Sequence, residues 1–155
     1  KNREIPPLDY DLVRLIKRDW PELNIILNGG INSIADAQKE LVSYKNNPDG
    51  IMMGRAIYTD PYMLSDVDKL FYDVERIKKS RFDIAREMIP YIEKEINQGT
   101  FINHITRHML GLFHGIKGAK LWRNYLSENA PKRKDDINVF KEALLKIEEI
   151  HKEVV

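Results

Sequence analysis

A chain of 155 residues with 43% apolar and 32% charged side chains can bury one ordinary core, or two small ones, beneath a charged surface. Its lack of cysteine excludes a disulfide, a thiolate metal site and a cysteine nucleophile among these residues, and fits a cytoplasmic protein. No stretch approaches the roughly 20 consecutive apolar residues of a membrane helix, so no membrane partner is expected.

The start of the chain predicts that these residues belong to a longer protein. It opens on "KNREIPPLDY", which is polar, lacks an initiator methionine and has no signal peptide. The elements that follow support the same expectation, because they supply only two strands.

Helical and strand patterns alternate over the first 65 residues. Apolar residues at helical spacing predict a helix over 9–20, and the Leu/Ile run at 23–28 predicts a strand buried on both faces. Ser33 is suited to cap a second helix, and the apolar run at 50–54 predicts a second strand. This order favours parallel strands joined by right-handed crossovers. Two strands do not make a stable sheet by themselves, so further strands are expected.

Strand patterns disappear after residue 65. Residues 66–80 have mixed charge and predict a helical linker. Glycines and a polar loop then separate four predicted helices, over 81–98, 100–114, 117–129 and 136–153. The predicted fold class is therefore α/β followed by all-α, with an α/β part at 1–65 and a helical domain at 81–155.

Each predicted strand ends in a glycine turn. Asn28-Gly29-Gly30 follows the first strand and Gly54-Arg55 follows the second, with 24 residues between Gly30 and Gly54. Glycine lets the backbone turn tightly and brings amide groups close to a ligand, and arginine can hold a phosphate bidentately. Adjacent strand ends that share one phosphate are typical of the last two strands of a (β/α)8 barrel. Two ordinary β-to-α turns are the alternative interpretation.

A basic block extends from Thr100 to Lys134. These 35 residues hold seven Lys or Arg side chains and one acid, Glu128, a net charge of +6 in a chain whose total is +1. Such a local excess favours a polyanion partner and predicts salt-dependent binding. The alternative is an ordinary solvated helix face, although such faces usually mix both signs. The bases are Arg107, Lys117, Lys120, Arg123, Lys132, Arg133 and Lys134.

His104 and His108 lie within this block. They are four residues apart, which predicts that both lie on one face of a helix. The sequence "HITRH" lacks the glutamate of the metalloprotease motif and has no evident third ligand, so we predict no metal site. The roles of both histidines stay open.

Several motifs point to one family: "NREIPPLDYD", "NGGI", "DGIMMGRAIY", "DPYML", "HITRHMLGLFHG" and "GAKLWRNYLSENA". Together they resemble the C-terminal half of bacterial tRNA-dihydrouridine synthases of the A subfamily, over essentially the whole chain. The glycine motifs are shared among many flavin barrels. The pair "HITRHMLGLFHG" and "LWRNYLSE" is far more specific.

The resemblance implies an FMN-containing (β/α)8 barrel, of which this chain holds the last two βα units, followed by a helical tRNA-binding domain. In that family NADPH reduces FMN, and the flavin reduces the C5–C6 bond of a D-loop uridine to give 5,6-dihydrouridine, while a cysteine protonates C5. By motif, the residues of the FMN phosphate site are Asn28, Gly29, Gly30, Gly54 and Arg55. The implied tRNA contacts are Arg3, Arg107, Lys117, Lys120 and Arg123.

The chain departs from the family pattern because it contains no cysteine. The general acid, the flavin-ring contacts and the first six strands are therefore expected upstream of Lys1. We predict no catalytic residue in this chain and expect it to bind tRNA rather than to catalyse. Its open strand edges leave self-association as an alternative.

Two other functions stay open. The first alternative is a non-catalytic RNA-binding helical module. The second is part of another FMN barrel oxidoreductase, one that acts on a small molecule. An upstream, cysteine-bearing half of a barrel would favour an enzyme over the module. Turnover that survives charge reversal in the basic block would favour the small-molecule enzyme.

Overall fold

The computed structural model describes residues 7–152, and contacts between Cα atoms divide the chain into two compact units. The strand unit ends at Ile57 and the helical unit begins at Tyr58. The predicted tRNA contact Arg3 lies outside the described residues. Between residues 7 and 152, no helix combines the length and apolar character needed to cross a bilayer.

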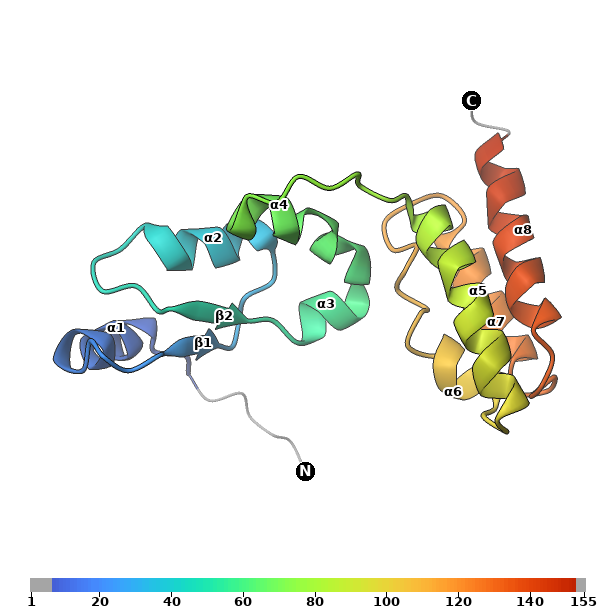
Figure 1. Cartoon of the computed structure of the whole chain (residues 1–155), viewed down its shortest axis with the longest axis horizontal. Helices are drawn as coiled ribbons and strands as arrows, with labels where there is room; N and C mark the ends of the chain where they lie inside the picture. The colour runs from blue at the N-terminus through green and yellow to red at the C-terminus, as the bar shows by residue number, and fades with distance from the viewer. Residues whose placement is uncertain (1–6, 153–155) are drawn as a thin grey trace. The chain divides into compact units, whose positions relative to one another are not determined.

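The strand unit is a small parallel sheet with helices beside it (Figure 1). β1 pairs with β2 in parallel, with Ile26 opposite Gly50 and Asn28 opposite Met52. The predicted element order and the parallel pairing are therefore confirmed. The elements are α1 (Tyr10–Asp19), β1 (Ile26–Asn28), α2 (Ile34–Val42) and β2 (Gly50–Met52).

Polar contacts fix the starts of these elements. The Asp9 carboxylate accepts a hydrogen bond from the first turn of α1, and the Ser33 hydroxyl accepts one from the first turn of α2, as predicted. Asp49 joins the two strands, because its carboxylate accepts from the Ile25 amide at 2.8 Å and from Lys17 Nζ at 2.9 Å. The Ile25 bond, aided by Lys17, holds the pKa of Asp49 below its ordinary value.

Both strands are shorter than the predicted ranges 23–28 and 50–54, and burial on both faces is wrong for β1. Leu27 is 3% exposed, whereas Ile26 is 56% exposed. Side chains alternate across a strand, so a second buried face requires elements on both sides of the sheet. The described residues supply such cover on the Leu27 side only.

Three short helices follow β2: α3 (Arg55–Thr59), the 3-10 helix η1 (Pro61–Asp66) and α4 (Val67–Tyr72). α4 ends at Asp73, whose φ of +51° is left-handed and cannot continue an α-helix. Residues 73–80 form no helix or strand, so the predicted helical linker 66–80 is helical only in its first half.

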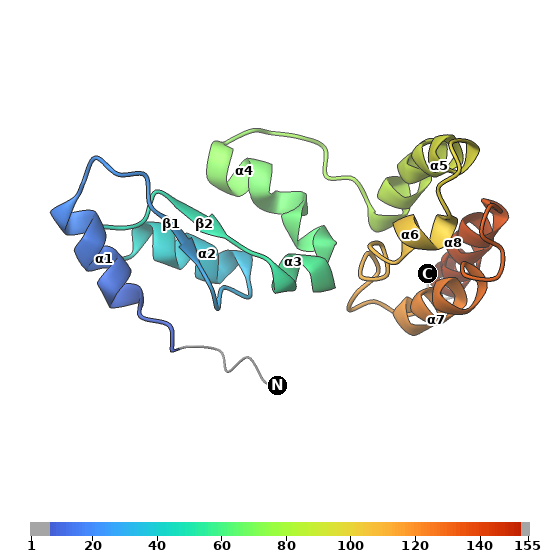
Figure 2. The same ribbon diagram turned by 90° about the horizontal axis from the view of Figure 1, so that it is seen from below.

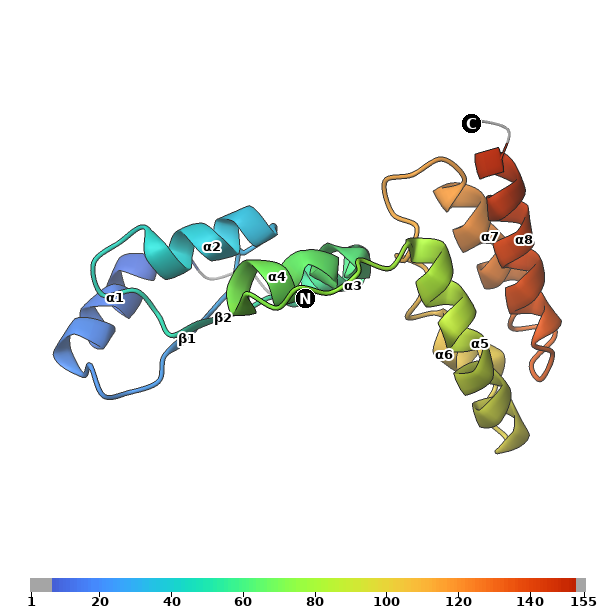
Figure 3. The same cartoon turned by 45° about the horizontal axis from the view of Figure 1, so that its top comes forward.

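The helical unit contains α5 (Arg81–Asn97), α6 (Ile102–Thr106), α7 (Ala119–Asn129) and α8 (Asn138–Lys152). α7 and α8 lie side by side, and α5 packs against α8 and α6 (Figures 2 and 3). Trp122 is at the centre of the core, with ring centroids 4.7 Å from Phe113 and 5.3 Å from Phe140. Its indole Nε1 donates to the Met109 carbonyl at 3.1 Å. The predicted helices 81–98, 117–129 and 136–153 match α5, α7 and α8 to within two residues at each end.

The predicted helix 100–114 is wrong, because α6 ends at Thr106. The chain continues in tight turns, in which the Met109 amide donates to the Thr106 carbonyl at 2.9 Å. Gly111 lies against the main chain of α3: a Cβ at this position would be 2.3 Å from the Thr59 carbonyl oxygen. His108 therefore lies beyond α6, and the prediction that His104 and His108 share a helix face is wrong.

Candidate functional site

The carboxyl ends of β1 and β2 meet at one edge of the sheet, because the strands are parallel. A cavity of about 210 Å³ lies at that edge, within the strand unit. All five residues predicted to hold a cofactor phosphate line it: Asn28, Gly29, Gly30, Gly54 and Arg55.

The turn after β1 has a conformation that requires glycine. Gly29 and Gly30 have φ values of +111° and +70°, in the region that side chains disfavour. A Cβ on Gly30 would also lie 2.7 Å from the hydroxyl oxygen of Tyr10. Tyr10 donates to the Gly29 carbonyl at 2.5 Å, and the Asn32 side chain donates to the Gly30 carbonyl at 2.9 Å. These two bonds fix the orientation of the peptide groups beside the cavity.

The groups that line the cavity are of the kinds that bind anions. The amides of Gly30, Ile31 and Gly54 find no acceptor among residues 7–152. Arg55 is exposed and forms no ion pair with a described residue. Successive free amides beside a guanidinium make a concavity suited to a phosphate group.

Tyr10 is a stable hydrogen-bond donor to this turn. Burial raises the pKa of its phenol, and the negative charges of Glu40 and Asp36 raise it further. The hydroxyl therefore keeps its proton at neutral pH and continues to donate to the Gly29 carbonyl. Sequence reasoning missed this role, because Tyr10 is distant in sequence from the turn and the motif "LDYD" says nothing of the contact.

In the helical unit, four predicted tRNA contacts are exposed and form no ion pair with a described residue. Arg107 follows the last residue of α6, and Lys117 lies just before α7. Lys120 and Arg123 are three residues apart on α7 and share its solvent face. The structure thus places exposed positive charge on α7 and at the end of α6.

Arg133 differs from the other cations of the basic block because it is held by acids. It donates to Glu142 at 2.7 Å and to Asp136 at 2.5 Å. The hydrogen bond to Glu142 is the main cause that raises the pKa of Arg133. The same bond, with one from Tyr125, lowers the pKa of Glu142 to about 2. Arg133 therefore stabilises the fold and adds little to the charge available to a ligand.

The histidines of the block contact protein groups. Arg107 Nε donates to His108 Nε2 at 3.0 Å, so His108 Nδ1 carries the proton toward the Tyr58 hydroxyl, 3.1 Å away. His104 is exposed beside Phe101, with ring centroids 5.7 Å apart. In the described part of the chain, no three His, Asp or Glu side chains cluster closely enough to hold a metal ion.

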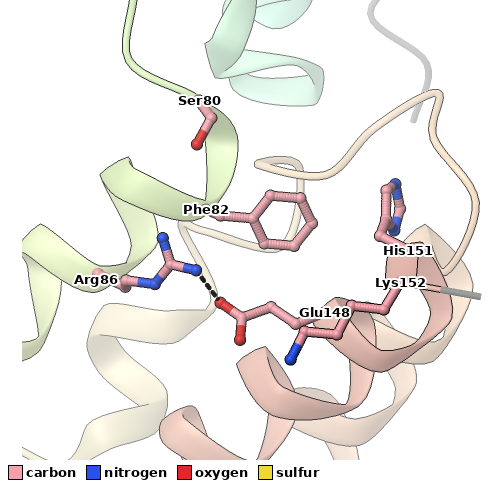
Figure 4. Close-up of a pocket in the computed structure, with 6 residues that line it drawn as sticks. All are labelled: Ser80, Phe82, Arg86, Glu148, His151 and Lys152. Carbon is pink, nitrogen blue, oxygen red and sulfur yellow. Dashed lines mark hydrogen bonds and ion pairs between the residues drawn. The ribbon is translucent and has the colours of Figure 1, made fainter. Parts of the chain in front are cut away.

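A larger cavity, of about 490 Å³, lies between the first turn of α5 and the end of α8 (Figure 4). Arg86 and Glu148 form an ion pair of 2.5 Å across its wall, and Phe82 lies against His151. Ser80 is engaged in the cap of α5. No predicted site residue lines this cavity, and these polar groups already have protein partners.

A parallel strand pair with a glycine-lined cavity at its carboxyl edge is followed in this chain by a helical unit with exposed cations. The chain belongs to the dihydrouridine synthase family, whose model "Dihydrouridine synthase (Dus)" matches residues 1–148. The family resemblance predicted from the motifs is thereby confirmed.

Curated relatives agree with this assignment. The chain is 47% identical over 147 residues to the tRNA-dihydrouridine(20/20a) synthase of Vibrio cholerae, covering 95% of this chain and 44% of that protein. It is 49% identical over 144 residues to the protein of the same name from Escherichia coli K12, covering 93% and 41%. For that of Shewanella oneidensis the identity is 50% over 141 residues, covering 91% and 41%. The chain thus spans less than half the length of these relatives.

Proposed function

We propose that the chain is part of a tRNA-dihydrouridine synthase that reduces a D-loop uridine of tRNA, at position 20 or 20a as in the names of its relatives. In this proposal residues 1–65 are the last two βα units of an FMN-binding (β/α)8 barrel, 66–80 are a linker, and 81–155 bind tRNA. The observation that supports this proposal most directly is that both glycine turns and Arg55 line one cavity.

The cavity fits the phosphate of FMN rather than the whole cofactor. Its volume of about 210 Å³ is below the roughly 300–1,000 Å³ of pockets that enclose a drug-sized ligand. The free amides of Gly30, Ile31 and Gly54 supply donors, and Arg55 supplies the countercharge. The flavin ring would then contact other strands of the barrel, at the carboxyl face where such barrels hold their ligands.

Bound FMN would supply hydride chemistry, taking a hydride from NADPH and passing it to C6 of the uridine. The residues of this chain have two tasks around that chemistry. The glycine turns and Arg55 hold the cofactor phosphate, and the exposed cations of the helical unit orient the tRNA. The general-acid cysteine that protonates C5 is not among these 155 residues, which contain no cysteine.

The tRNA role is supported by charge that remains free in the folded structure. Arg107, Lys117, Lys120 and Arg123 are exposed and form no ion pair with a described residue. Phosphate contacts of this kind position an RNA without reading its sequence. Arg3, which lies outside the described residues, is a fifth proposed tRNA contact.

The test is flavin binding by the full-length protein and its Arg55→Ala variant, with FMN and riboflavin as paired ligands. A charge-assisted phosphate contact contributes about 1.5–3 kcal/mol, so Arg55→Ala should weaken FMN binding about 10- to 150-fold. Riboflavin has no phosphate and should bind both proteins equally. Arg18→Ala is the matched control, because Arg18 pairs with Asp19 and does not line the cavity. Equal loss of FMN and riboflavin, or no loss, would contradict the phosphate site.

A non-catalytic RNA-binding module is the second candidate. It is favoured by the separate core of the helical unit. Under this alternative the full-length protein binds tRNA but oxidises no NADPH when FMN and tRNA are supplied. NADPH oxidation that depends on unmodified tRNA would reject it.

A further inference from the structure

A second cleft in the helical unit lies between α6, with the turn that follows it, and the C-terminal half of α7. Its volume is about 220 Å³. Leu110, Leu126 and Pro131 give it apolar walls, and polar groups come from Asn103, Arg107 and Ser127. It combines an apolar surface, neutral hydrogen-bonding groups and one cation.

Asn103 is the unusual residue of this cleft. Its side-chain oxygen is buried and has no hydrogen-bond partner among the described residues, and the residue lines the cleft. Buried polar groups in folded proteins are nearly always paired, so the unpaired oxygen of a residue that lines a cleft marks this residue as a contact for a ligand once its amide turns toward the cleft. An asparagine amide offers a donor and an acceptor side by side, which matches the edge of a nucleobase.

The positive charge around the cleft suits the phosphate of a nucleotide. Arg107 lines the cleft and is exposed. Ser127 lies on the solvent face of α7 that also carries Lys120 and Arg123, so the cationic face leads to the cleft. The neighbouring Thr106 hydroxyl is already used, because it donates to the Ile102 carbonyl at 3.0 Å.

We propose that this cleft binds one unstacked nucleotide of the tRNA. The base lies against Leu110, Leu126 and Pro131, and Asn103 and Ser127 hydrogen-bond its edge or its ribose, while Arg107 contacts the adjoining phosphate. A volume of about 220 Å³ suits a single base, and RNA recognition commonly uses such splayed-out bases. The inference rests on the proposed tRNA-binding function and adds a neutral contact that the basic block does not supply.

The experiment measures tRNA affinity against salt concentration for the full-length protein and cleft variants. Asn103→Ala and Ser127→Ala each remove neutral hydrogen bonds, so each should weaken binding about 2- to 13-fold. Ser127→Phe fills the cleft from an exposed position and should weaken binding more than Ser127→Ala. Because Asn103→Ala and Ser127→Ala remove no charge and leave the cleft open, their salt dependence should stay that of the wild type. Asn97→Ala is the matched control, since Asn97 is exposed and does not line the cleft.

The outcomes separate this inference from the proposed function. Weaker binding of all three cleft variants, with unchanged salt dependence in the two alanine variants, supports the nucleotide site, provided that their melting temperatures match the wild type. Salt-dependent wild-type binding with cleft variants equal to Asn97→Ala overturns the site and leaves tRNA binding intact. Wild-type protein that binds tRNA without salt dependence overturns both. A reduced salt dependence in Asn103→Ala or Ser127→Ala would mean that the cleft only borders phosphate contacts, and would also overturn the site.

Discussion

Removing Lys120 and Arg123 together should lower the salt dependence of tRNA binding by a calculable amount. The four predicted tRNA contacts of the helical unit that lie among the described residues are exposed and form no ion pair there: Arg107, Lys117, Lys120 and Arg123. Each phosphate contact contributes about 0.7 (single-stranded) to 0.9 (duplex) to the slope of log affinity against log salt. Four contacts therefore give a slope of about −2.8 to −3.6, and the double alanine variant about −1.4 to −1.8.

These slopes correspond to a large measurable difference. Between about 50 and 200 mM salt the wild type should lose affinity about 50- to 150-fold, and the variant only about 7- to 12-fold. Fluorescence anisotropy with labelled bulk tRNA measures both. Thermal unfolding of the variant should match the wild type, because both side chains are exposed on α7.

A matched control removes two cations that are already paired. Lys79 binds Glu87 at 2.7 Å, and Arg86 binds Glu148 at 2.5 Å. Lys79→Ala/Arg86→Ala makes the same change in net charge, yet should keep the wild-type slope. If the control lowers the slope as much as Lys120→Ala/Arg123→Ala, net charge rather than a defined surface governs binding. If neither variant changes the slope, the basic block does not contact tRNA phosphates.

Two further predictions concern the fold. Gly111→Ala should destabilise the helical unit by about 1–3 kcal/mol, because the new Cβ would lie 2.3 Å from the Thr59 carbonyl, a main-chain atom that cannot rotate away. Urea unfolding measures this, and an unchanged midpoint would refute the close contact. The pKa of Glu142 is lowered to about 2 from its ordinary value of 4.5 by Arg133, so this pair stabilises the fold above about pH 4.5 and loses its effect as pH falls toward 2. In Glu142→Gln the free energy of unfolding, measured with urea, should fall less than in the wild type as the pH drops from about 4.5 toward 2. Identical pH profiles of the two proteins would refute the role of this pair.

Local sequence signals were enough to predict the long helices. α5 begins at the capping box of Ser80 with Asp83 and ends just before Gly99, whose φ of +91° is left-handed. α7 and α8 place their apolar residues at helical spacing around Trp122 and Phe140. In each case the start, the stop and the buried face are encoded within the segment itself.

The failures depend on contacts between distant segments. Gly111 suits a close approach to Thr59, and no pattern within 100–114 reveals that neighbour. The predicted burial of the first strand assumed cover on both faces, which a sequence window cannot test. The pattern of apolar residues indicates which side chains a segment could bury. Whether they are buried depends on the neighbouring elements.

The sequence was enough to predict the part of the candidate site that depends only on strand topology. Parallel strands bring their carboxyl ends to one edge, so two glycine turns one βα repeat apart had to meet. Counting charges was less reliable, because it gave Arg133 the same weight as Lys120. Arg133 is bound to Asp136 and Glu142, and the acids that hold it lie just outside the segment that was counted.

Different interactions stabilise the two units. The helical unit has a core around Trp122, whereas among residues 7–57 of the strand unit the buried apolar residues are only Leu27, Ile31 and Ala37. The shape of the phosphate cavity therefore depends mainly on backbone conformation, on the parallel register and on the hydrogen bond from Tyr10, rather than on packing. Apolar side chains exposed on the sheet, such as Ile26 at 56%, are what neighbouring strands of the proposed barrel would cover. Cofactor binding and completion of the barrel should consequently be coupled, since the strands that cover this sheet would also fix the turns that hold the phosphate.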